Sequence, residues 1–116
     1  MLAVDPRGAE QRHEVAVTQR RIDYQPQPDG MGSVVAFLPA DGMATLRAAL
    51  GSAAGMASAD PSDTRTVDQR RVDALVELAR LSLATGRLGG SPAGTPLATS
   101  HGRRPLIQVT VPYASL

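Results

Sequence analysis

The chain has 116 residues, 12 Lys+Arg against 11 Asp+Glu, a formal net charge of +1 and no cysteine. This length fits one domain. The small net charge excludes a protein that binds nucleic acid through a broad basic surface, and the lack of cysteine excludes disulfides, thiolate zinc sites and cysteine nucleophiles. Residues 1–6 lack the basic and apolar regions of a signal peptide, and no apolar run of about 18 residues is present. We therefore expect a cytoplasmic protein that makes no membrane contact.

Hydrophobic residues make up 42% of the chain, but aromatic residues only 3%. Alanine contributes much of the hydrophobic share, and an alanine side chain removes little apolar area from water. We therefore expect a domain that is marginally stable on its own and has part of its surface covered by a partner.

The first predicted element is a short polar helix over residues 9–21. Its apolar residues recur at helical spacing but form only a thin stripe. Pro6 and Gly8 precede it as boundary residues.

A β-hairpin is predicted next, with strands over residues 21–27 and 33–38. Both stretches show the alternation or the β-branched residues that are typical of strands. Asp29 and Gly30 lie between them and suit a tight turn, because aspartate bonds to nearby backbone and glycine accepts a positive φ. Pro26 has no N–H and indicates that the first strand has one unpaired side.

A second helix is predicted over residues 39–57, with Pro39 in its first turn. Gly51 and Gly55 each cost about 1 kcal/mol relative to alanine inside a helix. Because small residues let another backbone approach closely, we interpret these glycines as a packing surface.

Residues 66–85 show the clearest helical pattern in the chain. Thr66 and Gln69 have the spacing of a capping box, in which each side chain accepts a backbone N–H of the other residue. Gly86 is the expected C-terminal cap, because glycine adopts the left-handed conformation readily.

Residues 86–104 are rich in glycine, proline, serine and threonine and are predicted to form a flexible loop. A third strand is predicted over residues 106–111. The element order indicates the α+β class, with a small three-stranded sheet (the hairpin plus the C-terminal strand) packed with two to three helices.

No catalytic, cofactor or metal site is predicted. His13 and His101 lie far apart, and neither has a second ligand at metal-binding spacing. Ser100 and His101 are neighbours in the predicted loop, whereas a catalytic serine needs a strained turn beside its histidine. An independent hydrolase would require His101 to bind a metal or to titrate abnormally.

A cluster of charged residues surrounds the start of the third predicted helix: Arg65, Asp68, Arg70, Arg71 and Asp73. At i,i+3 spacing, Asp68 is expected to pair with Arg71, and Arg70 with Asp73. These pairs either stabilise the start of the helix or leave Arg65, Arg70 and Arg71 to contact nucleic-acid phosphates or a partner carboxylate.

Arg103 and Arg104 precede the third predicted strand, as Arg20 and Arg21 precede the first. If these strands pair, the arginines form a modest positive patch at one sheet edge, a candidate contact for DNA or a partner. The alternative is a solvated edge that discourages aggregation.

Ordered sequence blocks span most of the chain: Asp5-Pro6, Arg20-Arg21-Ile22, Pro28-Asp29-Gly30-Met31, Leu38-Pro39-Ala40, the stretch over residues 65–75, and Val109-Thr110-Val111. In order and spacing they resemble the actinobacterial domain of unknown function 222 (DUF222), also called the 13E12-repeat family. The Asp-Gln-Arg-Arg-X-Asp-Ala-Leu block is the most specific part, and Gly32 stands where the family usually has alanine.

The resemblance implies a bacterial DNA-processing protein in which this region lies upstream of an HNH endonuclease module. On that basis we expect residues 1–116 to be a partial domain, without the N-terminal helical part of the family region and without the HNH module. Neither histidine lies in a matching motif, so no catalytic residue carries over.

We therefore favour a non-catalytic scaffold or accessory segment of an HNH-endonuclease-associated protein, which aids salt-dependent DNA docking or dimerisation. The alternative is a pure folding or oligomerisation module, or a truncated repeat remnant, that makes no nucleic-acid contact. The clustered arginines favour docking, and the low net charge favours the alternative.

Overall fold

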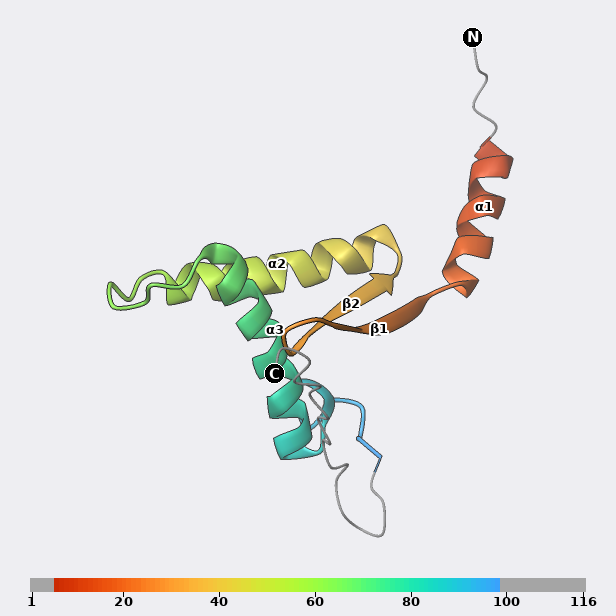
Figure 1. Cartoon of the computed structure of the whole chain (residues 1–116). Coiled ribbons are helices and arrows are strands. Elements are labelled where there is room, and N and C mark those ends of the chain that lie inside the picture. The colour runs from red at the N-terminus through yellow and green to blue at the C-terminus, as the bar shows by residue number, and fades with distance from the viewer. Residues whose placement is uncertain (1–5, 99–116) are drawn as a thin grey trace. The chain divides into compact units, whose positions relative to one another are not determined.

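The computed structural model describes residues 6–98 and contains three α-helices and a two-stranded antiparallel hairpin (Figure 1). In chain order the elements are α1 (Pro6–Thr18), β1 (Arg21–Gln27), β2 (Met31–Phe37), α2 (Ala40–Ala57), α3 (Val67–Thr85) and the 3₁₀ helix η1 (Leu88–Gly90). They fall into two compact units that divide within α2, between Ala44 and Thr45. The α+β class is confirmed, whereas the predicted third strand over residues 106–111 lies outside the described residues.

Helix α1 begins at Pro6 and ends at Thr18, so both predicted boundaries, residues 9 and 21, are wrong. Proline is tolerated at the first helical position because the N–H that it lacks has no helical acceptor there. At the other end, Arg21 already pairs with Phe37 in the hairpin. Helical periodicity does not detect this pairing, which takes the backbone out of the helix before residue 21.

Strand β1 has its predicted bounds, but β2 begins at Met31 rather than at residue 33. The turn explains the early start. Asp29 and Gly30 have φ angles of 64° and 71°, and the Met31 N–H donates to the Pro28 carbonyl at 3.3 Å. Positive φ at both positions lets the chain reverse within the three residues that separate Gln27 from Met31, and these two residues pair with each other. Pairing therefore begins immediately after the turn.

One face of the hairpin is apolar. Ile22 lies opposite Ala36, and Tyr24 lies opposite Val34, so these four side chains share a face. Ile22, Tyr24 and Val34 are 54%, 74% and 57% exposed. We call these four residues the hairpin apolar face, and in the described part of the chain no element covers it.

On the opposite face of the hairpin β1 contributes polar side chains, whereas β2 contributes Ser33 and the exposed Met31, Val35 and Phe37. Arg21 Nε lies 3.4 Å from Asp23 Oδ2, and the Arg21 guanidinium carbon lies 4.9 Å from the centre of the Phe37 ring. Gln27 Nε2 donates to Ser33 Oγ at 3.1 Å. Because these interactions are exposed, each contributes only a few tenths of a kcal/mol to about 1 kcal/mol.

Helix α2 begins at Ala40, and the preceding Pro39 carbonyl accepts the Met43 N–H at 3.0 Å. Gly51 and Gly55 lie in its second half. A Cβ added at either glycine would meet nothing within 4 Å. The packing surface predicted from these glycines therefore has no occupant among the described residues.

Gly51→Ala and Gly55→Ala are each expected to raise the free energy of unfolding by about 0.5–1 kcal/mol, because alanine loses less backbone entropy in a helix. Urea unfolding followed by far-UV circular dichroism measures this gain. Gly42→Ala is a control in the same helix, where the new Cβ would lie 3.3 Å from Leu38 Cδ1 and the gain should be smaller. Destabilisation by either of the first two substitutions would reveal a backbone packed against that face.

Helix α3 has both of its predicted caps. Thr66 Oγ1 accepts the Gln69 N–H at 3.1 Å, and Gln69 Oε1 accepts the Thr66 N–H at 2.8 Å. Gly86 is left-handed, with φ of 74°, and its N–H donates to the Ser82 carbonyl at 2.9 Å. The capping box and the glycine cap are confirmed, and together they fix where α3 begins and ends.

The segment after α3, predicted as loop, contains η1 and a β-bridge between Arg87 and Pro96. The Leu88 N–H donates to the Thr95 carbonyl at 2.9 Å. Beyond the bridge, the Leu97 N–H donates to the Gly86 carbonyl at 3.0 Å. These bonds turn the chain back toward the C-terminal end of α3.

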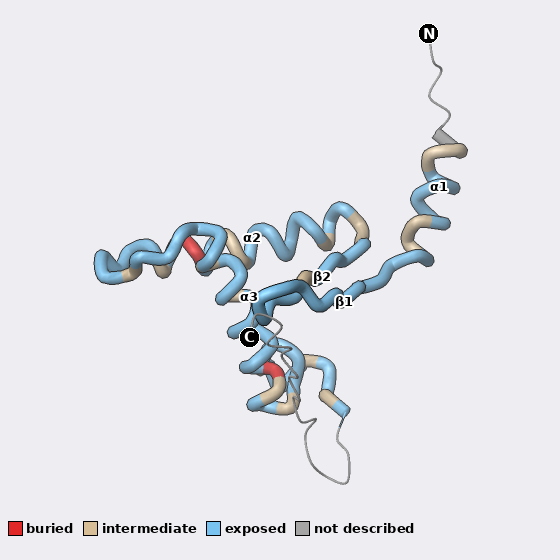
Figure 2. The backbone as a smooth tube through the Cα atoms, viewed as in Figure 1, coloured by how far each residue is buried: buried red, intermediate tan, exposed pale blue. Residues whose placement is uncertain are grey.

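Buried side chains are scarce in the part of the chain that the structure describes (Figure 2). Ala54 is 2% exposed and Ser82 is 4% exposed, and they are the only buried residues within 8–98. Large apolar side chains stay exposed in every helix and strand, with Leu78 at 43% as an example. The described residues therefore expose more apolar side chains than they bury.

Candidate functional site

The predicted charged residues come together at the N-terminal end of α3, and Asp63 of the preceding loop joins them. We call the whole group the α3 cap cluster: Asp63, Arg65, Asp68, Arg70, Arg71 and Asp73. The same loop is also held by Asp60, outside the cluster. Ser62 Oγ and the Ser62 N–H donate to Asp60 Oδ1 at 2.7 and 2.9 Å, and these hydrogen bonds lower the pKa of Asp60.

Arg65 is the centre of the α3 cap cluster. Its Nε and Nη2 donate to the two carboxylate oxygens of Asp63 at 2.9 and 2.7 Å, and its Nη1 donates to Asp73 Oδ2 at 2.8 Å. A guanidinium fork that matches a carboxylate in this way is the strongest common geometry for an ion pair. The hydrogen bonds from Arg65 lower the pKa of Asp63 to about 2, and both carboxylates raise the pKa of Arg65.

The two remaining arginines have different environments. Arg71 Nη1 lies 2.9 Å from Asp68 Oδ1, which confirms that predicted i,i+3 pair. The predicted pair of Arg70 with Asp73 is wrong, because Arg65 takes Asp73 and Arg70 Nη1 instead donates to the Arg65 carbonyl at 2.8 Å. Arg70 Nε is buried without a hydrogen-bond partner. Arg70 therefore acts mainly as a brace between the loop and the first turn of α3.

Acid should release the link between Asp63 and Arg65. The folded pKa of Asp63 is about 2, below its ordinary value of 3.8, so its stabilising contribution is complete above about pH 4 and is lost as the pH falls through about 2. A carboxyl-carbon NMR titration of Asp63 is expected to have its midpoint near pH 2. In an Arg65→Gln variant the midpoint should move up toward the ordinary value. An unchanged midpoint in that variant would contradict the assigned cause.

A second feature is an apolar groove on α3. It lies where the C-terminal half of the helix meets the segment that follows it. Its lining residues are Leu75, Leu78, Ala79, Ser82, Leu83, Leu88 and Leu97. Sequence analysis missed this groove, because η1 and Leu97, which complete it, belong to the stretch predicted as flexible loop. The groove has the character of a site for an apolar side chain and not for an ion.

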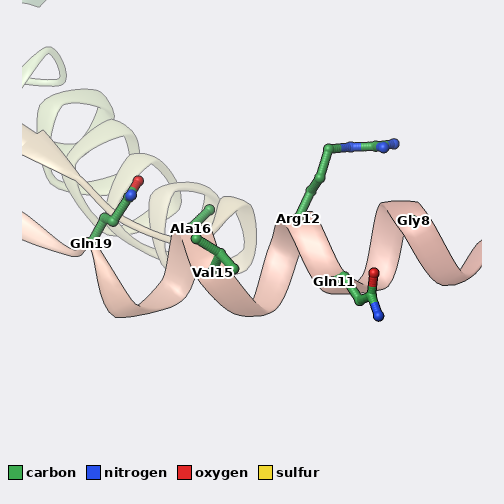
Figure 3. A pocket seen from close by; sticks show the side chains of 6 residues that line it. All are labelled: Gly8, Gln11, Arg12, Val15, Ala16 and Gln19. Atoms are coloured by element: carbon green, nitrogen blue, oxygen red, sulfur yellow. The ribbon is translucent and has the colours of Figure 1, made fainter.

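Five residues of α1 and Gln19, which directly follows it, line an open hollow (Figure 3): Gly8, Gln11, Arg12, Val15, Ala16 and Gln19. No second element contributes to it, so the hollow is a stretch of helix surface. His13 belongs to a different depression, between α1 and the chain that follows β2. No group of three or more His, Asp or Glu side chains within residues 6–98 can hold a metal ion.

The remaining predicted site residues, Arg103 and Arg104, lie outside the described residues, as does His101. None of the described helices combines the length and the apolar composition that crossing a bilayer requires.

Comparison with known proteins gives one match. The family described as "Domain of unknown function (DUF222)" matches residues 1–114. No curated protein and no solved structure matches the chain.

Proposed function

Because this chain belongs to the DUF222 family, we propose that it is a non-catalytic scaffold segment of a cytoplasmic HNH-endonuclease-associated protein. In this role it holds other protein parts together through its apolar surfaces.

The observation that carries the proposal is the exposure of apolar surface in both units. The first unit presents the hairpin apolar face, with Tyr24 74% exposed. The second presents the groove on α3, which is lined by leucines. Contiguous apolar surface of this kind is characteristic of sites that other protein covers.

DNA docking is the other role within this proposal, and the charges argue against it. Arg65 and Arg71 are paired with aspartates, and the α3 cap cluster contains as many carboxylates as guanidiniums. Phosphate-binding surfaces need unpaired positive charge. Charge pairing therefore favours the association role over docking.

Sedimentation of the purified chain, together with binding of a hydrophobic fluorescent dye, tests the association role. We expect concentration-dependent association or strong dye binding, and Leu78→Glu should reduce it. Ala84→Glu adds the same charge to α3 outside the groove and is the matched control. A monomer that binds no dye would contradict the proposal. Nicking of plasmid DNA in the presence of magnesium or manganese would contradict its non-catalytic part.

The double substitution Arg70→Ala, Arg71→Ala separates a structural role from docking. If the arginines stabilise the start of α3, the free energy of unfolding should fall by about 1 kcal/mol, since an ion pair and a loop brace are lost. If they bind phosphate, stability should hold while affinity for a labelled DNA duplex falls. Urea unfolding and fluorescence anisotropy across a salt series measure the two effects. We expect the first result and no binding to DNA.

A further inference from the structure

The two edges of the hairpin differ in chemistry. Strand β1 contains Pro26, which has no N–H, and the Arg21–Asp23 ion pair. Strand β2 (Met31–Phe37) contains neither a proline nor a charged residue. Within the described residues β2 pairs only with β1, so its other edge is free.

Natural sheets protect free edges with proline, charge or irregular backbone, because an unpaired row of N–H and carbonyl groups recruits another strand. The β1 edge carries two of these protective features and the β2 edge carries none. Residues along β2 are exposed except for the half-exposed Ser33. The β2 edge is therefore the side of the hairpin at which a strand can be added.

We infer that the free edge of β2 pairs antiparallel with β2 of a second copy of this chain. The inference rests on the proposed association role and names the surface that performs it. In a pairing centred on Val34, that residue faces its own copy, Gly32 faces Ala36, and Met31 faces Phe37. When a strand pairs with its own copy, any charge on it lies near the same charge on the partner strand. Because β2 has no charged residue, self-pairing brings no like charges together.

This register also preserves the sidedness of the sheet. Val34 and Ala36 lie on the hairpin apolar face in both copies, so that face becomes continuous over four strands. A two-stranded hairpin is marginally stable in water, whereas sheets of about four strands with one apolar face sustain themselves. Self-pairing therefore gives the free edge of β2 hydrogen-bond partners and enlarges the sheet from two strands to four.

Charge-swapped variants test the inference. Val34→Lys and Val34→Glu each place like charges opposite each other at the two-fold axis, so each variant alone is expected to raise the dimer Kd on the order of tenfold. An equimolar mixture of the two should restore the dimer as a heterodimer, which also shows that each variant folds. Sedimentation equilibrium of the full chain measures all three Kd values.

Tyr24→Lys is the matched control. It adds the same charge to the hairpin apolar face opposite Val34, but on β1, away from the proposed pairing edge. The dimer should survive this change. Equal loss of dimer with Tyr24→Lys and Val34→Lys would mean that the copies stack by their faces, and it would overturn the inference.

Three further outcomes distinguish failure of the β2 pairing from failure of the association role. Association that is insensitive to every Val34 variant but is abolished by Leu78→Glu would overturn the β2 pairing and leave the association role standing. A monomeric full chain whose shortened form, residues 1–98, dimerises would assign the edge to residues 99–116 and overturn self-pairing. A chain that neither associates nor binds dye would contradict the association role and the inference together.

Discussion

Replacing Gly94 by alanine is expected to lower the free energy of unfolding by about 3 kcal/mol, at the upper end of the cost of overpacking. A Cβ at this position would overlap the Leu88 carbonyl oxygen and lie 3.0 Å from the Ser91 carbonyl oxygen. Both obstacles are backbone atoms, so a side-chain rotation cannot relieve the contact. The Gly94 N–H also donates to the Ser91 carbonyl at 2.8 Å, which holds the two residues close.

Urea unfolding and amide hydrogen exchange together measure the effect of Gly94→Ala. Exchange at Leu88 and Leu97, whose N–H groups donate within this segment, should accelerate even if the segment opens locally before the helices unfold. Gly55→Ala is the control, because nothing lies within 4 Å of its new Cβ. A loss below about 1 kcal/mol with unchanged exchange would show that the turn accommodates a Cβ, against the expected clash.

The features that could be predicted from sequence are those set by residues close together in the chain. The capping box needs only Thr66 and Gln69, and the turn needs only Asp29 and Gly30, so the local sequence specifies each of them. Asp68 and Arg71 pair for the same reason, since i,i+3 residues are neighbours on any helix. In all three cases the geometry follows from the backbone of a single element.

The features that were missed depend on the path of a loop. Arg65 reaches Asp73 only because the loop that contains Asp63 turns back beside the first turn of α3. The sequence does contain a signal for Asp63. An aspartate side chain often accepts the backbone N–H of the residue two positions later, and Asp63 accepts the Arg65 N–H in this way at 3.1 Å. Composition identified the stretch after α3 as loop but could not reveal its β-bridge, because bridge partners lie on opposite sides of a turn.

Apolar exposure links the fold to the proposed role. Residues 8–98 satisfy their local hydrogen-bonding rules at the hairpin turn and at both ends of α3, yet they bury only Ala54 and Ser82. Local rules can define helices and strands, but burial of apolar surface supplies most of the free energy of folding. The scaffold proposal has this physical basis: the described residues have complete caps and little core, and they would gain stability from contact with other protein surface.

Ser82→Ala is expected to lower the free energy of unfolding by about 1–2 kcal/mol, because it removes a buried hydroxyl that makes two hydrogen bonds to backbone groups. Ser82 is 4% exposed, and its Oγ accepts the Gly89 N–H at 2.8 Å and donates to the Leu78 carbonyl at 2.9 Å. Removal of the hydroxyl deletes the hydrogen bond from the Gly89 N–H to Ser82, which links η1 to α3.

The matched control for Ser82→Ala is Thr85→Ala, one turn away on the same helix. Thr85 Oγ1 likewise donates to a backbone carbonyl, that of Leu81 at 2.9 Å, and accepts a backbone N–H, that of Arg87 at 3.3 Å, but these bonds are exposed and water can replace them. We expect that control to change stability by less than about 0.5 kcal/mol. Amide exchange at Gly89 should accelerate in Ser82→Ala more than in the control. Equal effects of the two substitutions would mean that the Ser82 hydroxyl is no more important than an exposed one, and that the groove on α3 is held by apolar contacts and the backbone bridge instead.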